Sequence, residues 1–281
     1  MGIEERTVDV FARAAATYGR VGPDLFGHFG SRVIRLLALT PDCSVLDVAC
    51  GAGAVLHEAT AVLGPNGRAI GVDLTPAMVA QAKASLTKPK VAVMDAHALG
   101  FASGTFDVVV SNFAFTYFAQ PRRVLEECRR VLRPEGRFGL VLHDGWWWHD
   151  DPRWAWHGQL LAEFGNSHAT TTRRFSDPNT VCAVVEQAGF ANTGVAVEPF
   201  DLRWADADSW WKWCWSHGYR VVLEAFDTAR LHAFRSACFS HLGPGPIEGE
   251  LPVIVVIADR AAERGSDDFE FGVRSLPRPA L

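Results

Sequence analysis

The sequence predicts an α/β fold in which helices cover both faces of a doubly wound, mostly parallel sheet. Short apolar runs alternate with helical segments through the first half of the 281-residue chain, which is typical of such a sheet. The apolar run 45–48 also ends in a glycine turn, Gly51-Ala52-Gly53, and a helical segment follows at once. A strand, a glycine turn and a helix in this order form a nucleotide-type pocket at the carboxyl end of the strand.

The remaining elements are predicted from the same patterns. Residues 7–38 read as helices that cover the pocket from the N-terminal side. Apolar residues repeat at helical spacing within 121–132, and the segment 177–189 has a proline in its first turn and a glycine at its end. The predicted strands are 45–49, 68–73, 90–94, 107–111, 137–142, 193–200 and 252–258, and further helices are expected at 53–63 and 76–86.

The glycine turn departs from the dinucleotide fingerprint G-x-G-x-x-G, because Leu56 stands at the third glycine position. Asp47 inside the strand discriminates better, because a carboxylate there repels a pyrophosphate but suits a ligand with an ammonium group. Asp73 ends the second strand, where an acid can accept hydrogen bonds from ribose hydroxyls. S-adenosyl-L-methionine (SAM) has an amino-acid end, a ribose and an adenine but no phosphate, so it matches these features better than NAD.

At this point the chain resembles a known family, the class I SAM-dependent methyltransferases. The likeness is strongest to the branch with ubiquinone/menaquinone-biosynthesis and small-molecule, secondary-metabolite methyltransferases, and it covers roughly residues 10–145. It rests on motifs in matching order and spacing at 45–53, 71–78, 94–96, 106–112 and 130–137. The resemblance implies a Rossmann-like sheet of seven strands, with the seventh antiparallel beside the sixth.

The resemblance also implies a role for each matching residue. The backbone around Gly51 and Gly53 would hold the methionine moiety, with Asp47 nearby. Asp73 would bind the ribose, and Asp95 the adenine amino group. The full set of implied cofactor-binding residues is Tyr18, Asp47, Ala49, Gly51, Gly53, Asp73, Leu74, Met78, Asp95, Ala96, Asn112 and Phe113.

Three of these assignments have structural alternatives. Asp73 could instead cap the helix that begins near Pro76, because aspartate is a good N-cap. Asp95 could be a turn residue in Asp95-Ala96-His97. Tyr18 could be a packing residue rather than a cover for the methionine end.

Composition narrows the functional class. The formal net charge of −5 argues against a nucleic-acid-binding protein, which usually presents a basic face. The six cysteines form no C-x-x-C pair, so we expect no metal site and reduced thiols. The N-terminus lacks the apolar stretch of a secretory signal, and the longest late apolar run, 253–258, is too short to span a bilayer. We therefore expect a cytoplasmic protein that acts on a small molecule, and leave open whether it forms a homodimer.

All ten tryptophans lie between residues 146 and 215. The segments 145–175 and 205–248 that hold most of them are longer than a minimal fold requires, so we interpret both as lid insertions within one domain spanning 1–281. The simplest alternative is that the tryptophans build a small second core. We expect a few of them to contact a flat or apolar substrate, and the candidates are Trp146, Trp147, Trp211 and Trp215.

Methyl transfer to a hydroxyl or a carbon acid needs a base, and two histidines are candidates. His143 follows the fifth strand at the edge where ligands bind, and His217 follows the tryptophan-rich helix. Asp150 and Asp151 could cap a helix near Pro152 instead of taking part. The predicted function is SAM-dependent methylation of an O, N or C atom of a small hydrophobic or aromatic molecule, with S-adenosyl-L-homocysteine as product. The alternative is a SAM-binding cyclase or binding protein that transfers no methyl group.

Overall fold

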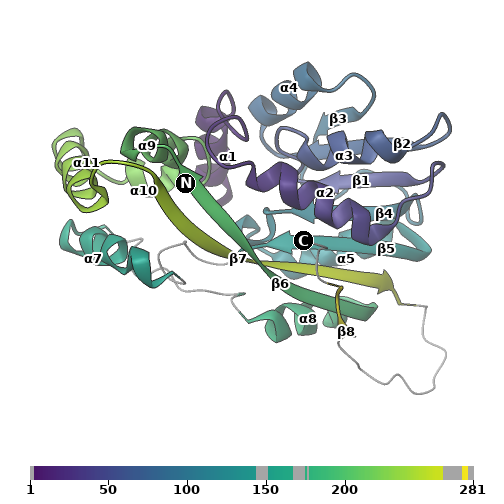
Figure 1. Cartoon of the computed structure of the whole chain (residues 1–281). Helices are drawn as coiled ribbons and strands as arrows, with labels where there is room; N and C mark the ends of the chain where they lie inside the picture. Colours follow the sequence, from purple (N-terminus) through teal and green to yellow (C-terminus); the bar gives the residue numbers. More distant parts are fainter. Residues whose placement is uncertain (1–2, 144–150, 167–174, 176, 262–273, 278–281) are drawn as a thin grey trace.

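The computed structural model describes residues 3–143, 151–166, 175, 177–261 and 274–277. Eight strands form one sheet, with helices on both faces and a group of helices beyond its carboxyl edge (Figure 1). The strands are β1 (Ser44–Val48), β2 (Arg68–Asp73), β3 (Lys90–Val93), β4 (Phe106–Asn112), β5 (Leu132–Leu142), β6 (Phe190–Trp204), β7 (Ile247–Arg260) and β8 (Arg274–Ser275). The α-helices are α1 (Ile3–Ala14), α2 (Leu25–Leu37), α3 (Ala54–Val62), α4 (Pro76–Ser85), α5 (Pro121–Val131), α7 (Ala155–Glu163), α8 (Pro178–Gln187), α9 (Ala207–Trp215), α10 (Arg220–Glu224) and α11 (Thr228–Leu242), and the 3-10 helices are η1 (Phe115–Tyr117) and η2 (Pro152–Trp154).

The strand order is β3-β2-β1-β4-β5-β7-β6-β8. β1 to β5 pair in parallel, and β7 runs antiparallel between β5 and β6. The prediction of a doubly wound, mostly parallel sheet with an antiparallel seventh strand is confirmed. β6 and β7 are longer than predicted, because they continue past the sheet as a two-stranded ribbon that pairs as far as Trp204 and Ile247. The short β8 was not predicted.

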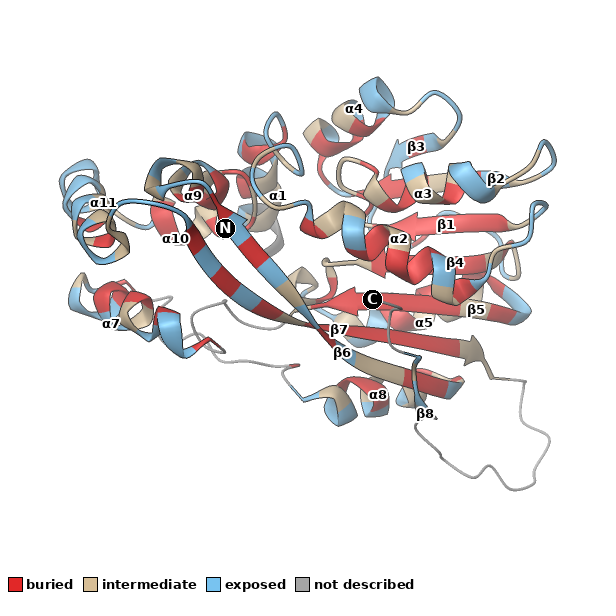
Figure 2. Cartoon of the chain, in the orientation of Figure 1, coloured by how far each residue is buried: buried red, intermediate tan, exposed pale blue. Residues whose placement is uncertain are grey.

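Alternating side chains of the parallel strands enter two separate apolar cores. On β1, Val45 packs with α2, α3 and α4 on one face, whereas Leu46 and Val48 pack with α5 and α8 on the other. Burial on both faces explains why the central strands read as continuous apolar runs rather than alternating ones. Figure 2 shows β1, β4 and β5 buried between these layers. The carboxyl ends of the strands are therefore the part of the sheet left for a ligand.

The position of the missing third glycine is occupied by a packing residue. Leu56 is fully buried in α3, and a Cβ placed on Gly71 of β2 would lie 2.6 Å from Leu56 Cδ1 and 2.8 Å from Cys50 Sγ. In this chain the glycine that permits close helix–strand packing is thus on the second strand. Gly71 packs against Leu56, the residue that stands at the third glycine position of the dinucleotide fingerprint.

We expect Gly71→Ala to lower the free energy of unfolding by about 1–3 kcal/mol, because the added methyl overpacks a filled site. Denaturant unfolding would measure the loss. Combining it with Leu56→Ala should cost less than the sum of the two single changes, since the smaller side chain makes room for the methyl. Strict additivity of the two changes would contradict this packing.

The ribbon of β6 and β7 holds α9, α10 and α11 at its far end, and α7 packs against α11 (Figure 1). We call α9, α10 and α11 the insertion. Its interior is aromatic: Trp210 is fully buried, and Trp154 and Trp204 are nearly so. Trp154 also donates a hydrogen bond from Nε1 to the Glu248 carbonyl on β7, at 3.0 Å. These tryptophans belong to the same apolar core as Val45 and do not form a separate second core.

Candidate active site

Asp47, Asp73 and Asn112 lie at the carboxyl ends of three adjacent strands. Asp47 pairs with Gly71 of β2 and with Val110 of β4, which fixes the register of the three strands. Asp73 is the last residue of β2 and Asn112 the last of β4. Parallel strands present these ends at one edge, at the point where the strand order reverses.

The backbone turns sharply at the same edge. Gly51 and Gly53 have φ values of 51° and 92°. Ala49 and Phe113, the residues that follow β1 and β4, also have positive φ, at 58° and 56°. Non-glycine residues rarely adopt this conformation, and such strain is concentrated at functional sites. The two strained residues were assigned to the site from sequence, but no pattern indicated their conformation.

Asp73 holds the glycine turn in place. Its carboxylate accepts hydrogen bonds from the Gly51 N–H at 2.9 Å and from the Thr75 N–H at 2.8 Å. Burial raises the pKa of Asp73, and these two backbone bonds only partly oppose the rise. The N-cap residue of α4 is Thr75 and not Asp73. Asp73 therefore braces the turn rather than capping the helix, and it still lines a cavity.

Asp47 is a buried acid whose oxygen atoms lack partners among the described residues. The side chain is 1% exposed, and neither carboxylate oxygen accepts a hydrogen bond. Burial, and then the charge of Asp73, raise the pKa of Asp47 well above its usual range. A buried, unpaired carboxylate is costly unless a cation or donor comes to it. Asp47 is the feature that fits an ammonium group best.

Asp95 forms a small polar pair with the next histidine along the chain. Oδ1 accepts hydrogen bonds from the His97 N–H and from His97 Nδ1, both at 2.8 Å. Burial alone would raise the pKa of Asp95, but the hydrogen bonds from His97 outweigh it and the pKa is lowered. The carboxylate thus stays ionised. Its Oδ2 accepts no hydrogen bond within the part of the chain described, which leaves it able to accept from an amino group.

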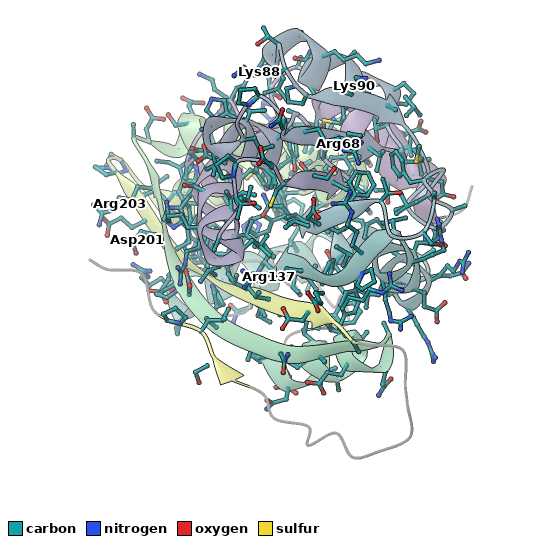
Figure 3. All side chains as sticks on the ribbon, turned by 90° about the vertical axis from the view of Figure 1, so that its right-hand side faces the viewer. Arg68, Lys88, Lys90, Arg137, Asp201 and Arg203 are labelled. Carbon is teal, nitrogen blue, oxygen red and sulfur yellow. The ribbon has the colours of Figure 1, made fainter. Side chains whose placement is uncertain are left out.

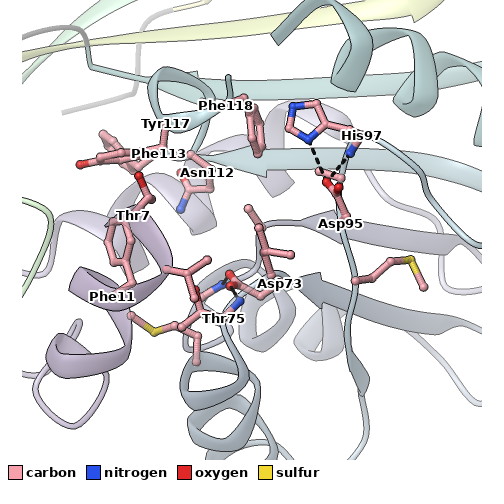
Figure 4. Close-up of a pocket in the computed structure, with 18 of the residues that line it drawn as sticks. Thr7, Phe11, Asp73, Thr75, Asp95, His97, Asn112, Phe113, Tyr117 and Phe118 are labelled. Atoms are coloured by element: carbon pink, nitrogen blue, oxygen red, sulfur yellow. Dashed lines mark hydrogen bonds and ion pairs between the residues drawn. The ribbon is translucent and has the colours of Figure 1, made fainter. Parts of the chain in front are cut away.

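A cavity of about 740 Å³ joins these residues (Figure 4). Figure 4 shows Asp95 and His97 on one side, Asp73 and Thr75 in the middle, and an aromatic group with Phe11 and Tyr117 on the other. Ten of the twelve predicted cofactor residues line this cavity: Tyr18, Ala49, Gly51, Asp73, Leu74, Met78, Asp95, Ala96, Asn112 and Phe113. The other two, Asp47 and Gly53, line a second cavity around the glycine turn that shares Tyr18, Ala49, Gly51 and Asn112 with the first.

Tyr18 covers the glycine turn from the N-terminal side. A Cβ on Gly51 would lie 3.3 Å from its ring, and the ring stacks on Phe26 with centroids 4.5 Å apart. Tyr18 thus packs and lines both cavities at once. The two roles considered from sequence are compatible.

The predicted bases and tryptophans lie elsewhere. His143 follows β5, and its Nδ1 is 3.4 Å from the Pro252 carbonyl oxygen on β7. His217 donates from Nδ1 to the Trp213 carbonyl at 2.7 Å, and burial lowers its pKa to about 4, which makes it a weak base at neutral pH. Neither histidine lines the two cavities described above.

Trp211 and Trp215 also point into the insertion. Trp211 contacts Phe239 with ring centroids 6.3 Å apart, and the Arg220 guanidinium lies 5.1 Å from the Trp215 ring centroid. The structure does not bring these two rings to the cavity, because a helix surrounded by packing partners uses its tryptophans as core. Trp146 and Trp147 lie outside the described residues. Asp151 caps η2 by accepting from the Arg153 N–H, as its alternative reading predicted.

Sequence reasoning missed the aromatic side of the cavity. Thr7 and Phe11 reach it from α1, and Tyr117 and Phe118 reach it from the segment after β4. Phe11 packs edge-on against Tyr117, with centroids 5.1 Å apart. The only available signal was the predicted cover by residues 7–38, which did not specify which side chains faced inward.

The insertion fastens α1 over the cavity. Arg13 of α1 makes a two-pronged ion pair with Glu224 of α10, at 2.8 and 2.5 Å. Arg220 bonds the same carboxylate at 2.6 Å and the Arg13 carbonyl at 3.2 Å. Partial burial alone would raise the pKa of Glu224. The pKa is lowered, because the hydrogen bonds and charges of Arg13 and Arg220 outweigh that effect.

Charge differs between the two edges of the sheet. Arg68 and Lys90 begin β2 and β3, and with Lys88 they lie at the amino edge, which faces the viewer in Figure 3. Asp47 and Asp73 lie near the carboxyl edge. The ligand edge is acidic, which favours a cationic ligand over a phosphate-bearing one.

Comparison with known proteins agrees with this geometry. Residues 46–140 match the family described as a methyltransferase domain. Nocamycin O-methyltransferase of Saccharothrix syringae is 29% identical, over 88% of this chain and 96% of its own length. Demethylmenaquinone methyltransferase of Thermotoga maritima is 37% identical, over 49% of this chain and 62% of its own length. Residues 46–140 thus correspond to a methyltransferase domain, and the chain is similar to SAM-dependent methyltransferases.

Solved structures support the fold alone. The YcgJ protein of Bacillus subtilis superposes with a TM-score of 0.56 at 21% identity, covering 84% of this chain and all of that one. Haemonchus contortus phosphoethanolamine N-methyltransferase 2 gives a TM-score of 0.56 at 14% identity, over 92% of this chain and 59% of that one. Among the described residues, no helix is both long and apolar enough to cross a bilayer.

The residues present fit SAM. The partnerless carboxylate of Asp47 would receive the ammonium group, and the exposed backbone of the turn at Gly51 would meet the methionine carboxylate. Asp73 would accept from the ribose, and Asp95 from the adenine amino group. Leu74 is 38% exposed and would pack on the adenine ring. When bound, SAM supplies a methyl group already activated by the sulfonium.

Proposed function

We propose that the enzyme methylates an oxygen, nitrogen or carbon atom of a small hydrophobic or aromatic molecule in secondary metabolism. The observation that supports this most directly is the aromatic side of the cavity, which adjoins the SAM residues and contains no charged side chain among the described ones. Two relatives are named for nocamycin and for aklanonic acid, the second being 27% identical over 49% of this chain. Their names support a small-molecule acceptor.

The protein's tasks in such a transfer are alignment and exclusion of water. Asp47 and the glycine turn would fix the donor at one end, and Asp95 at the other. Asn112, whose Nδ2 donates to the Phe26 carbonyl at 3.2 Å, and Phe113 would border the reacting centre. The cover 7–38 and the segment 205–248 would close the site, whereas much of 145–175 lies outside the described residues. Neither histidine is proposed as a base: His143 stands at the carboxyl end of β5 but lines neither cavity, and His217 is disfavoured by its low pKa.

Incubation with methyl-labelled SAM and a panel of phenols, quinols and polyketide-like aromatics tests the proposal. We expect a labelled product and one equivalent of S-adenosyl-L-homocysteine. Calorimetric titration should show that SAM binds and NAD does not. Binding of NAD without SAM would overturn the cofactor assignment. Conversion of an acceptor with no S-adenosyl-L-homocysteine formed would replace methyl transfer by a cyclase-type reaction.

A further inference from the structure

The cavity has two chemically different halves. The half with Asp73 and Asp95 holds the groups that fit the cofactor. The other half is formed by Phe11, Phe113 and Tyr117, and it shows no lysine, arginine or carboxylate among the described lining residues. If SAM occupies the first half, as the proposed function requires, the acceptor must occupy the second to meet the methyl group.

The insertion packs behind the wall of the second half, against two residues that line it. A Cβ placed on Gly218, between α9 and α10, would overlap the Tyr117 hydroxyl oxygen and lie 3.0 Å from Tyr117 Cζ and 3.5 Å from Phe11 Cζ. Glycine at 218 is thus what allows the insertion to meet the tyrosine. Its backbone φ is not in the left-handed region, so the constraint is space and not conformation.

This contact is held from both sides. On the insertion, Trp213 packs on Gly22, where an added Cβ would lie 2.5 Å from Trp213 Cδ1. On α1, the Arg13–Glu224 ion pair fixes the helix that carries Phe11. A side chain added at position 218 would therefore press on Tyr117, which lines the cavity.

Tyr117 contributes a donor that stays protonated. Burial raises its pKa to about 12, so it does not serve as a base near neutral pH. Tyr117 lines the cavity, and its hydroxyl lies against Gly218. Among the described lining residues, an anionic group at this end of an acceptor would find no cation to balance it, and its burial would be costly.

We infer that Tyr117, with Gly218 packed behind it, forms the specificity-determining wall of the acceptor subsite, and that this subsite selects flat acceptors that are uncharged near the reacting atom. The inference rests on the proposed function, because it assumes that SAM fills the other half. Tyr117 is a wall and positioning residue, and Gly218 sets how far the wall stands from the methyl group.

The test uses the full-length protein with S-adenosyl-L-homocysteine bound, titrated with 1-naphthol and with 1-hydroxy-2-naphthoic acid. We expect 1-naphthol to bind at least tenfold more tightly than 1-hydroxy-2-naphthoic acid, which is ionised at neutral pH. Gly218→Ala should weaken 1-naphthol binding at least tenfold while SAM affinity changes less than twofold. Adding Tyr117→Phe to Gly218→Ala should restore binding to within about threefold of the Tyr117→Phe variant, because it removes the overlapping oxygen. Ser236→Ala, on the exposed surface of α11, is the control and should change nothing.

Several outcomes would overturn the inference. The first two are tighter binding of 1-hydroxy-2-naphthoic acid than of 1-naphthol, and no binding of either compound. The others are unchanged 1-naphthol affinity in Gly218→Ala, and a double variant that binds 1-naphthol no more tightly than Gly218→Ala. The SAM affinity of Gly218→Ala shows whether this variant is folded. If it is not, Tyr117→Leu takes its place, because it enlarges the subsite without a new clash, and its preference should shift toward bulkier naphthols. Failure of the proposed function looks different, since SAM itself would then not bind, or an acceptor would be converted with no S-adenosyl-L-homocysteine formed.

Discussion

Asp47→Asn should weaken SAM binding about 100-fold and at the same time stabilise the cofactor-free protein. Removing one partner of a buried charge pair costs about 2–5 kcal/mol, and every 1.4 kcal/mol is about tenfold in affinity. Without SAM, however, the Asp47 carboxylate is buried and neither oxygen has a partner among the described residues. Neutralising it removes that cost, so the Tm should rise by a few degrees.

The pH dependence has a definite sign. The pKa of Asp47 is raised in the folded protein, by burial first and by Asp73 second. The destabilisation by the carboxylate is therefore absent below the ordinary aspartate pKa and grows as the pH rises through the raised folded value. SAM affinity should rise with pH over the same window, because the ammonium group binds the ionised form. Asp47→Asn should flatten both dependences.

Calorimetry in buffers of different ionisation enthalpy would detect the proton that wild-type protein releases on binding SAM. Asp42→Asn is a matched control, since Asp42 is an exposed acid that precedes the other end of the same strand. It makes the same change in net charge and should alter neither affinity nor Tm. A variant Asp47→Asn that binds SAM as tightly as wild type would show that the ammonium group lies elsewhere.

Asp73→Ala should weaken SAM binding at least tenfold, for two separable reasons. It removes the acceptor for the ribose hydroxyls, and it frees the Gly51 N–H and the Thr75 N–H that Asp73 now binds. Hydrogen bonds to charged groups are each worth about 1.5–3 kcal/mol.

Titration with adenosine and with 2′-deoxyadenosine separates the two reasons. Wild-type protein should prefer adenosine, and the preference should disappear in Asp73→Ala if the carboxylate binds the ribose. An equal loss for both nucleosides, with the preference retained, would mean that Asp73 only braces the glycine turn. Asp73→Asn keeps one acceptor oxygen, so its SAM affinity should lie between those of the wild type and Asp73→Ala.

The cofactor half of the site was predictable because its residues lie at strand ends. Asp47, Asp73 and Asn112 each stand within or directly after an apolar run, and the carboxyl ends of parallel strands meet at one edge. Local pattern therefore fixed their position in space. The five parallel strands followed from the same runs.

The acceptor half depends on contacts between distant parts of the chain. Phe11 lies on α1, which contacts both α4 and α10, and the ion pair to α10 joins Arg13 and Glu224, which are 211 residues apart. Trp211 and Trp215 lie on a helix that is surrounded on several sides, and sequence could not say which side faces the cavity. The sequence also underestimated the lengths of β6 and β7, because only pairing between these two distant strands extends them beyond the sheet.

The ion pair between α1 and α10 has a consequence for how such an enzyme can be altered. The first helix and the insertion between β6 and β7 are at opposite ends of the sequence, yet hydrogen bonds from Arg13 and Arg220 meet on one carboxylate. An insertion grafted from a relative would lack a partner for Arg13 unless it brought its own first helix with it. For recombination between homologues, we therefore expect these two segments to work best when they are exchanged together.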